Sequence, residues 1–402
     1  MAELLAPAGT FEKMETAFRF GADAVYFAGK KFGLRAFAGN FDDKEIETAT
    51  KYAHDLGKKV YITINILAHE ADFEELGEYL KQLVKYNVDA VIVSDLGIIQ
   101  FIRENFPGLT IHVSTQANIL NSFAIKLLYN LGVKRIILAR ELSIEEIKKI
   151  RQNTPKEIEL EAFVHGAMCI AYSGRCLLSN YLTSRDANRG ACAQACRWEY
   201  TITEKSRKGD EYEIQEDDKG TYILNSKDLM MIDHLSELED AGVSSFKIEG
   251  RMKSPYYVAN TVNAYRRAMD LGKNISKEQM ELLKNELYKS SHRKYTTGFY
   301  LGAKDKECLQ SSSPVQTYEY MAYVIGDSDG EKVLIEQRNR FKVGEVLQVL
   351  SPSNCFNQDI IVNKLTGEKG EDVLDAKNVQ QKLYIYTNLP LKRGDILRKK
   401  II

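Results

Sequence analysis

The stretch NVDAVIVSD, residues 87–95, places a short apolar, β-branched run directly after a helix end and a turn. The same theme recurs as GADAVYF at residues 21–27 and as GVKRIIL at residues 132–138. Continuous apolar runs of this length, bounded by turn residues, are typical of strands that are buried on both faces of a parallel sheet. The repetition therefore indicates strands that alternate with helices.

Eight such strands are expected within roughly the first 270 residues, which is close to the roughly 250 residues of a (β/α)8 barrel. Amphipathic stretches lie between them, with apolar residues three and four positions apart. We predict a TIM-like barrel, and a doubly wound open sheet is the alternative. The expected strands begin at Glu3, Asp23, Lys59, Asp89, Thr110, Arg135, Glu157 and Ser244.

The pattern changes twice along the chain. Residues 1–272 are assigned to the barrel, which is interrupted after its seventh strand by an insertion at residues 166–224. Residues 273–317 are predicted to form a helical connector. Short alternating runs then predict a small all-β, barrel-like domain over residues 318–402.

The 402 residues carry a formal net charge of -1, which does not by itself indicate a nucleic-acid-binding protein. No apolar run approaches the roughly 20 residues that span a bilayer, so no membrane partner is expected. The first residues do not resemble a signal peptide. A cytoplasmic location is the resulting expectation, and clustered cysteines there favour metal or redox chemistry over disulfides.

Four of the six cysteines lie in the insertion, at Cys169, Cys176, Cys192 and Cys196. Such a set can ligate a tetrahedral zinc ion or a four-iron, four-sulfur (4Fe–4S) cluster. The first pair is too widely spaced for a zinc knuckle, and neither common ferredoxin spacing is present. The spacing leaves both metals open, and we favour iron–sulfur over zinc or over four unrelated buried thiols.

Arginines accompany these cysteines, and planar guanidinium groups suit bidentate capture of carboxylate or phosphate. They could equally offset the negative charge of thiolate ligands. The arginines concerned are Arg175, Arg185, Arg189 and Arg197.

A long motif, EAFVHGAMCIAYSGRCLLS at residues 161–179, resembles the signature of the collagenase-like peptidases of undetermined catalytic type. The similarity continues in NSKDL at residues 225–229 and in KIEGRMKSPYYVA at residues 247–259. It covers essentially the whole chain, and the compact two-domain form most resembles the branch of this family that hydroxylates tRNA.

This resemblance implies an enzyme that converts the wobble uridine of tRNA to 5-hydroxyuridine. It implies prephenate as co-substrate, no need for molecular oxygen, and a 4Fe–4S cluster on the four clustered cysteines. The implied partners are tRNA and a small anionic co-substrate, and a homo-oligomer or a paralogous partner subunit stays open.

Barrel enzymes build their active sites at the carboxyl ends of the strands, where the pattern also places Asp95. Carboxyl and imidazole groups there are candidate general acids or bases, although the glutamates could equally be salt-bridge partners. The predicted catalytic residues are Glu161, His165 and Glu249. Arginines would clamp the carboxylates of prephenate. The predicted substrate-binding residues are Arg35, Asn65, Gln116, Arg140, Arg175, Asn225 and Arg251.

Two other functions stay open. A peptidase is named by the resemblance, but the chain holds neither an H-E-x-x-H nor a G-x-S-x-G motif. A dyad of His165 with Cys169 is the remaining basis for it, and His112 has the same ambiguity between core and site. The third function is an RNA-binding scaffold with a structural metal, to which the basic, aromatic stretch at residues 289–306 and the basic residues 391–400 would contribute.

Overall fold

The computed structural model describes two compact units, and their limits differ from the predicted boundaries at residues 272 and 317. The first unit comprises Met1–Met14, Ala22–Met252 and Arg293–Pro314, and the second comprises Glu15–Gly21, Lys253–His292 and Val315–Ile402. The helix after the eighth strand therefore belongs to the second unit. The described residues are 2–33, 39–168, 178–183, 185, 192–193, 195, 216–217, 220–221, 227–302 and 315–401.

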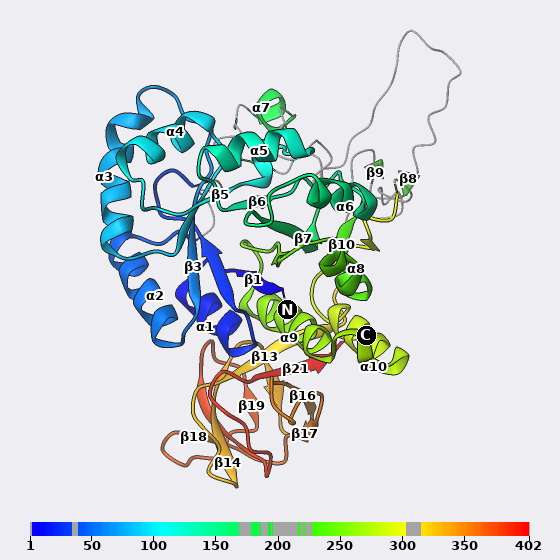
Figure 1. The fold of residues 1–402 in the computed structure, drawn as a ribbon. Coiled ribbons are helices and arrows are strands. Elements are labelled where there is room, and N and C mark those ends of the chain that lie inside the picture. Colours follow the sequence, from blue (N-terminus) through cyan, green and yellow to red (C-terminus); the bar gives the residue numbers. More distant parts are fainter. Residues whose placement is uncertain are drawn as a thin grey trace. The chain divides into compact units, whose positions relative to one another are not determined.

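Eight parallel strands within the described residues close a barrel, which confirms the predicted fold (Figure 1). Closure is made by β11, which pairs with β1 on one side and with β7 on the other. The strands, in their order around the barrel, are β1 (Glu3–Pro7), β2 (Ala24–Phe27), β3 (Lys59–Ile64), β4 (Ala90–Val93), β5 (Ile111–Val113), β6 (Arg135–Ile137), β7 (Glu159–Ala167) and β11 (Ser245–Ile248).

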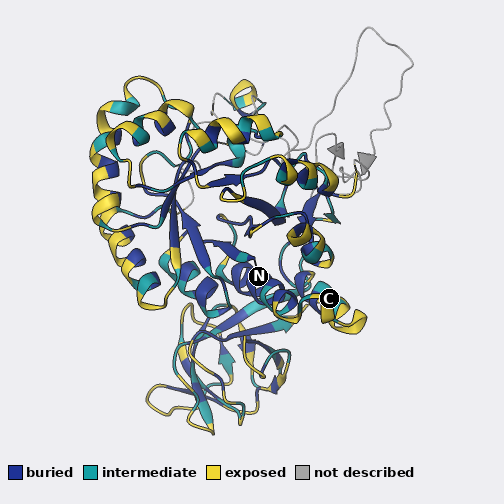
Figure 2. Cartoon of the chain, in the orientation of Figure 1, coloured by how far each residue is buried: buried dark blue, intermediate teal, exposed yellow. Residues whose placement is uncertain are grey.

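Burial explains why the strand sequences are continuously apolar rather than alternating. Every residue of β2 and of β4 is buried, because one face of a barrel strand packs inside and the other packs beneath helices. Figure 2 shows the strands as buried and much of the helical surface as exposed. The polar exceptions on the strands are therefore informative about function.

Local capping signals start several helices. Asp42 and Glu45 form a capping box at α2, and Ser143 and Glu146 form one at α6. No helix in the described part of the chain is long and apolar enough to cross a membrane. The helices are α1 (Phe11–Arg19), α2 (Asp43–Asp55), α3 (Asp72–Lys85), α4 (Leu96–Asn105), α5 (Ser122–Asn130), α6 (Ile144–Gln152), α7 (Leu178–Thr183), α8 (Leu235–Asp240), α9 (Pro255–Leu271) and α10 (Lys277–Leu287).

Short strands that the sequence pattern did not predict extend the barrel sheet beyond β7. Strand β10 (Asp228–Met230) runs antiparallel to the end of β7, with Asp228 opposite Ala167. Strand β12 (Tyr295–Thr296) then pairs with β10. Within the insertion, β8 (Glu216–Asp217) pairs with β9 (Gly220–Thr221). The chain thus leaves the barrel at the end of β7 and returns beside that same end.

The second unit contains the predicted all-β domain, which is antiparallel. Its seven-stranded sheet has the order β17-β16-β21-β13-β14-β20-β18, and β15 (Phe341–Lys342) pairs separately with β19 (Asp375–Ala376). The strands of the sheet are β13 (Tyr318–Val324), β14 (Lys332–Gln337), β16 (Val346–Leu350), β17 (Asp359–Ile361), β18 (Leu365–Gly367), β20 (Lys382–Tyr386) and β21 (Ile396–Lys400).

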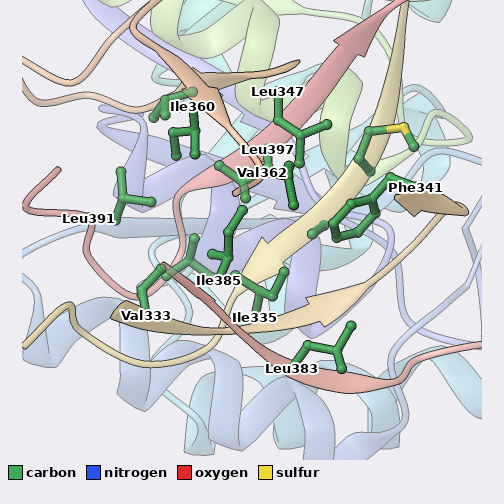
Figure 3. Packing of buried hydrophobic residues seen from close by; sticks show 14 of the residues in the cluster. Val333, Ile335, Phe341, Leu347, Ile360, Val362, Leu383, Ile385, Leu391 and Leu397 are labelled. Atoms are coloured by element: carbon green, nitrogen blue, oxygen red, sulfur yellow. The ribbon is translucent and has the colours of Figure 1, made fainter. Parts of the chain in front are cut away.

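Alternate residues of these strands form the core of the β domain. Val333 and Ile335 of β14 pack with Leu383 and Ile385 of β20 in one buried apolar cluster (Figure 3). The residues between them, such as Tyr384, are consequently on the outer face of the sheet. The burial pattern of β14 alternates in the same way.

A polar network inside the second unit links α9 and α10 to the β domain. The fully buried guanidinium of Arg398 donates to the carboxylate of Glu286 in α10, with Nη2 at 3.0 Å from Oε2. It also donates to Oδ1 of Asn260 in α9 at 3.0 Å. This buried charge is therefore neutralised and hydrogen-bonded, as burial requires.

Candidate active site at the barrel rim

Two predicted substrate-binding amides meet at the carboxyl ends of β3 and β5. Asn65 Nδ2 donates to Gln116 Oε1 at 2.6 Å. The Ser94 hydroxyl, which follows β4, donates to the carbonyl oxygen of Asn65 at 2.9 Å. Three neighbouring strand ends are thereby tied together. The two neutral amides can donate to and accept from a polar substrate.

Arg251 links strands that are not neighbours in the barrel. Its Nη1 donates to the hydroxyl of Thr63 in β3 at 3.2 Å, although β1 and β2 separate β3 from β11. The side chain therefore extends across the barrel opening, and only 4% of the residue is exposed. Lys13 Nζ donates to the Arg251 carbonyl at 3.3 Å. Burial lowers the pKa of Lys13 below its ordinary value.

Arg140, which follows β6, is held at the end of β7 by two contacts. Its Nη1 donates to the carbonyl oxygen of Ala167 at 2.7 Å, and its guanidinium lies 3.9 Å from the centre of the Phe163 ring. The Arg140 Nε is buried and has no hydrogen-bond partner among the described residues. The Phe163 backbone is itself fixed, because its carbonyl accepts from the Tyr300 hydroxyl at 2.8 Å.

Glu249 and His165 come together where the register between β11 and β7 shifts. The shift lies at Ile248 opposite His165, and the Glu249 N–H donates to the His165 carbonyl at 2.8 Å. Gly166 has a φ of +105°, and a Cβ there would lie 2.6 Å from the Glu249 carbonyl oxygen. Glycine is therefore required at this close approach. Both predicted catalytic side chains are buried, at 7% and 1% exposure.

Glu161 does not lie at the strand end where the sequence analysis placed it. It is the third residue of β7, fully buried, and its Oε1 accepts from Lys247 Nζ at 2.7 Å. Its Oε2 lies 3.1 Å from Nη1 of Arg135. Charged residues near the start of three strands thus form an ion cluster inside the barrel. This arrangement corresponds to the salt-bridge alternative, and the catalytic role of Glu161 stays a prediction.

The same cluster includes Glu3 and shifts several pKa values. Burial opposes ionisation of Glu3, but Arg135 at 2.5 Å and the Tyr61 hydroxyl at 2.7 Å together bring the pKa of Glu3 below its ordinary value. Burial lowers the pKa of Lys247, and Glu161 only partly offsets it. Burial and the nearby cations hold the pKa of His112 well below 6.5. His112 is buried and packs against the Tyr61 ring.

Of the four predicted metal ligands, the structure describes Cys192, whose side chain is exposed. The adjacent Ala193 N–H donates to the buried Ser179 hydroxyl at 2.9 Å, and that hydroxyl donates to the Arg185 carbonyl at 2.7 Å. Four thiolates are the donor set that a 4Fe–4S cluster takes. Within the described ranges, no three His, Cys, Asp or Glu side chains are grouped to hold a metal ion. The predicted site residues outside the described ones are Arg35, Cys169, Arg175, Cys176, Cys196 and Asn225.

Two aspartates near the rim differ in what they do. Asp95 caps α4, because its carboxylate accepts from the Ile98 N–H at 3.1 Å. Asp228 is buried, and its Oδ2 accepts from the Arg293 N–H at 3.0 Å, while Oδ1 has no hydrogen-bond partner in the described structure. Asp228 lies in the NSKDL motif, and the sequence pattern alone predicted no role for it. Its position next to Ala167 makes it a further candidate site residue.

Comparison with known proteins matches both parts of the chain to one family. The profile described as "Peptidase family U32" matches residues 9–310. The profile described as "Peptidase family U32 C-terminal domain" matches residues 316–398. Together they confirm the resemblance inferred from the motifs.

Relatives in this family carry different names. "tRNA hydroxylation protein P" of Escherichia coli (strain K12) is 37% identical, over 92% of this chain and 90% of its own. "23S rRNA 5-hydroxycytidine C2501 synthase" of the same organism is 40% identical, over 67% of this chain and 39% of its own. "Collagenase" of Porphyromonas gingivalis (strain ATCC BAA-308 / W83) is 33% identical, over 75% of this chain and 74% of its own.

Proposed function

Because the chain belongs to peptidase family U32, we propose that it is an RNA hydroxylase whose substrate is tRNA. The observation that carries this proposal is the relative named tRNA hydroxylation protein P, which is 37% identical over 92% of the chain. An rRNA-modifying relative supports RNA as the substrate class. In detail, we propose conversion of the wobble uridine to 5-hydroxyuridine, dependent on prephenate and independent of molecular oxygen.

The rim of the barrel offers cations for a small anionic co-substrate. Arg140 Nη1 donates to the carbonyl oxygen of Ala167, and Arg251 Nη1 donates to the hydroxyl of Thr63. A guanidinium has five N–H donors in a planar fork, so each arginine can also bind a carboxylate. Prephenate has two carboxylates, and one arginine for each is the arrangement that we propose.

Proton transfer is assigned to the pair at the register shift between β7 and β11. Glu249 and His165 are both buried, and the backbone hydrogen bond between them fixes their strand ends together. A carboxyl group and an imidazole can act as general acid and base when burial removes them from water. Asn65 and Gln116 would orient the polar base.

The proposed ligands of a 4Fe–4S cluster are Cys169, Cys176, Cys192 and Cys196. A bound cluster supplies one-electron chemistry or a site for an oxygen-bearing group. The four-cysteine donor set supports the cluster, and the exposed Cys192 lies beside a backbone held by Ser179. The cluster is proposed from this donor set and from the resemblance.

The test is an assay on protein purified without air, with unmodified tRNA transcript, prephenate and a reductant. The tRNA is then digested to nucleosides, which are separated and identified by mass spectrometry. Formation of 5-hydroxyuridine only when prephenate is present, and equally without oxygen, supports the full proposal. If 5-hydroxyuridine forms without prephenate, the result would support tRNA hydroxylation but would contradict the proposal that prephenate is the co-substrate. No hydroxylated nucleoside from several tRNAs would overturn the proposed function.

A peptidase is the second candidate, and the collagenase relative favours it. The same protein preparation, incubated with denatured collagen, provides the comparison. The peptidase would be favoured if the peptide-releasing activity co-purifies with the protein and is absent from a His165→Ala variant. Absence of release under conditions where tRNA is hydroxylated would reject it.

A further inference from the structure

A row of basic and aromatic side chains crosses the outer face of the β domain. Tyr386 of β20 stands directly opposite Lys332 of β14, and its N–H donates to the Lys364 carbonyl on the other side. Tyr386 is therefore flanked by Lys332 of β14 on one side and by Lys364, which directly precedes β18, on the other. Lys364 Nζ lies 5.0 Å from the centre of the Tyr386 ring.

A second tyrosine repeats this contact two residues earlier on the same strand. Tyr384 has Lys332 Nζ at 4.6 Å from its ring centre. Because Leu383 and Ile385 are in the core, Tyr384 and Tyr386 both project outward and are half-buried. Residues two apart on a strand are about 6.6 Å apart. The two rings thus form an aromatic platform, with a lysine ammonium group over each ring.

The charge on this face is mixed but more basic than acidic. Lys382 lies opposite Glu336, and Glu336 pairs with Arg338 at 3.0 Å. Lys364 Nζ lies 3.9 Å from Asp372 Oδ1, and that carboxylate is 76% exposed. Lys332 has a ring contact and no ion pair among the described residues. The face can therefore receive phosphate groups at Lys332 and Lys364.

We propose that this face, defined as Lys332, Lys364, Tyr384 and Tyr386, binds a single-stranded or loop segment of RNA. Bases would stack on the two tyrosines while phosphates contact the lysines, as on other RNA-binding sheet surfaces. The inference rests on the proposed function for its partner, since it names where the β domain would hold the RNA. An acidic protein or an anionic membrane would use the lysines but not the aromatic platform.

The first experiment measures tRNA binding by fluorescence anisotropy as a function of salt. The Lys332→Ala/Lys364→Ala double variant of the full chain should bind tRNA about 10- to 30-fold more weakly at 0.1 M salt. Its salt slope should fall by about 1.4, the value for two lost phosphate contacts to single-stranded RNA. The matched control is Lys342→Ala/Lys377→Ala, which removes two exposed lysines of the same unit, one in β15 and one directly after β19. An equal effect in this control would overturn the assignment.

The second experiment separates stacking from charge. The Tyr384→Leu/Tyr386→Leu variant should lose at least about 5-fold in affinity with an unchanged salt slope, while Tyr→Phe at both positions should retain it. Thermal melting of each variant shows whether the fold is intact. If the leucine variant is unfolded, the binding affinity of the phenylalanine variant can still be interpreted. Unchanged affinity in the leucine variant would overturn the proposal. So would lysine variants whose loss is equally large for polyglutamate or for anionic vesicles.

The two proposals can fail separately because binding and hydroxylation are measured apart. If the wild-type protein hydroxylates tRNA and the variants bind tRNA normally, the proposed RNA-binding face is rejected and the proposed function is supported. If the variants bind tRNA weakly and the wild-type protein does not hydroxylate tRNA, the RNA-binding face is supported and the proposed function is rejected.

Discussion

The central carbon of the Arg140 guanidinium lies over the Phe163 ring, 3.9 Å from the ring centre. Lys247 approaches the same ring at 5.5 Å. Phe163 therefore contacts both a rim arginine and a lysine of the buried ion cluster that contains Glu161. An aromatic ring in this position holds a cation in place without neutralising its charge.

Replacing Phe163 by Leu should release Arg140 and raise the KM for prephenate about 2- to 30-fold, the range of a lost cation–π contact. The kcat should change less, and Phe163→Tyr should restore the KM. The measurement is a prephenate titration at saturating tRNA. As a control, Phe246→Leu removes a buried phenylalanine of β11 and should leave the KM unchanged. A KM that is normal in Phe163→Leu would reject the positioning role.

Arg251→Ala should weaken the use of prephenate while leaving the iron content unchanged. The reason is that Arg251 spans the opening to Thr63, so its loss removes both a cation and a link between β11 and β3. Thr63→Val removes the hydrogen bond but keeps the cation, and it should have the smaller effect on KM. Equal prephenate dependence in Arg251→Ala and wild type would contradict the assignment.

Cys192→Ala should lose the cluster and the hydroxylase activity together. Iron and acid-labile sulfide per chain, with a visible spectrum before and after reduction, provide the measurement on protein purified without air. Cys355→Ala is the control, because Cys355 is buried in the core of the β domain and is not one of the four clustered cysteines. Full iron content in Cys192→Ala would remove Cys192 from the proposed ligands.

Glu161→Gln should destabilise the barrel by about 3–5 kcal/mol, because Arg135 and Lys247 would stay buried without their shared carboxylate. Glu159→Gln changes a 48% exposed carboxylate on the same arginine and should cost less than about 1 kcal/mol. Urea unfolding compares the two variants. Glu161→Gln protein that is stable but inactive would instead support the predicted catalytic role.

Glu3 makes part of this stability dependent on pH. Its folded pKa is below the ordinary 4.5, so its contribution is complete above pH 4.5 and is lost as the pH falls through the folded pKa. Glu3→Gln should therefore lower the free energy of unfolding at pH 7, and the difference from wild type should shrink as the solution is made more acidic than pH 4.5. A constant difference down to pH 3 would show that Glu3 does not titrate in this way.

The barrel could be predicted because each of its strands is buried on both faces and is recognisable as an apolar run. Strand β10 could not, since Asp228–Met230 is short and pairs through tertiary contact with β7. Glu161 was placed at the rim because a carboxylate in a strand looks like a site residue. Its counter-ions, Arg135 and Lys247, come from β6 and β11, and no local pattern in the sequence shows that they meet.

The sequence indicated which residues lie at the rim of the barrel, but it gave less information about the contacts that orient them. Residues after a strand end were expected to face the opening, and Asn65, Gln116, Arg140 and Arg251 are found there. The contacts that orient them involve Phe163, Thr63 and Ala167, which have no unusual chemistry and give no signal in the sequence.

The pairing of Ala167 with Asp228 has a consequence for how this family can diversify. The chain exits and re-enters the barrel at two residues that are antiparallel neighbours, so the ends of the intervening segment are held together by the scaffold itself. Loop-closure entropy grows slowly with length, so a longer or shorter segment between these ends costs the barrel little. A change in the length of the cysteine-bearing segment is therefore compatible with an unchanged barrel.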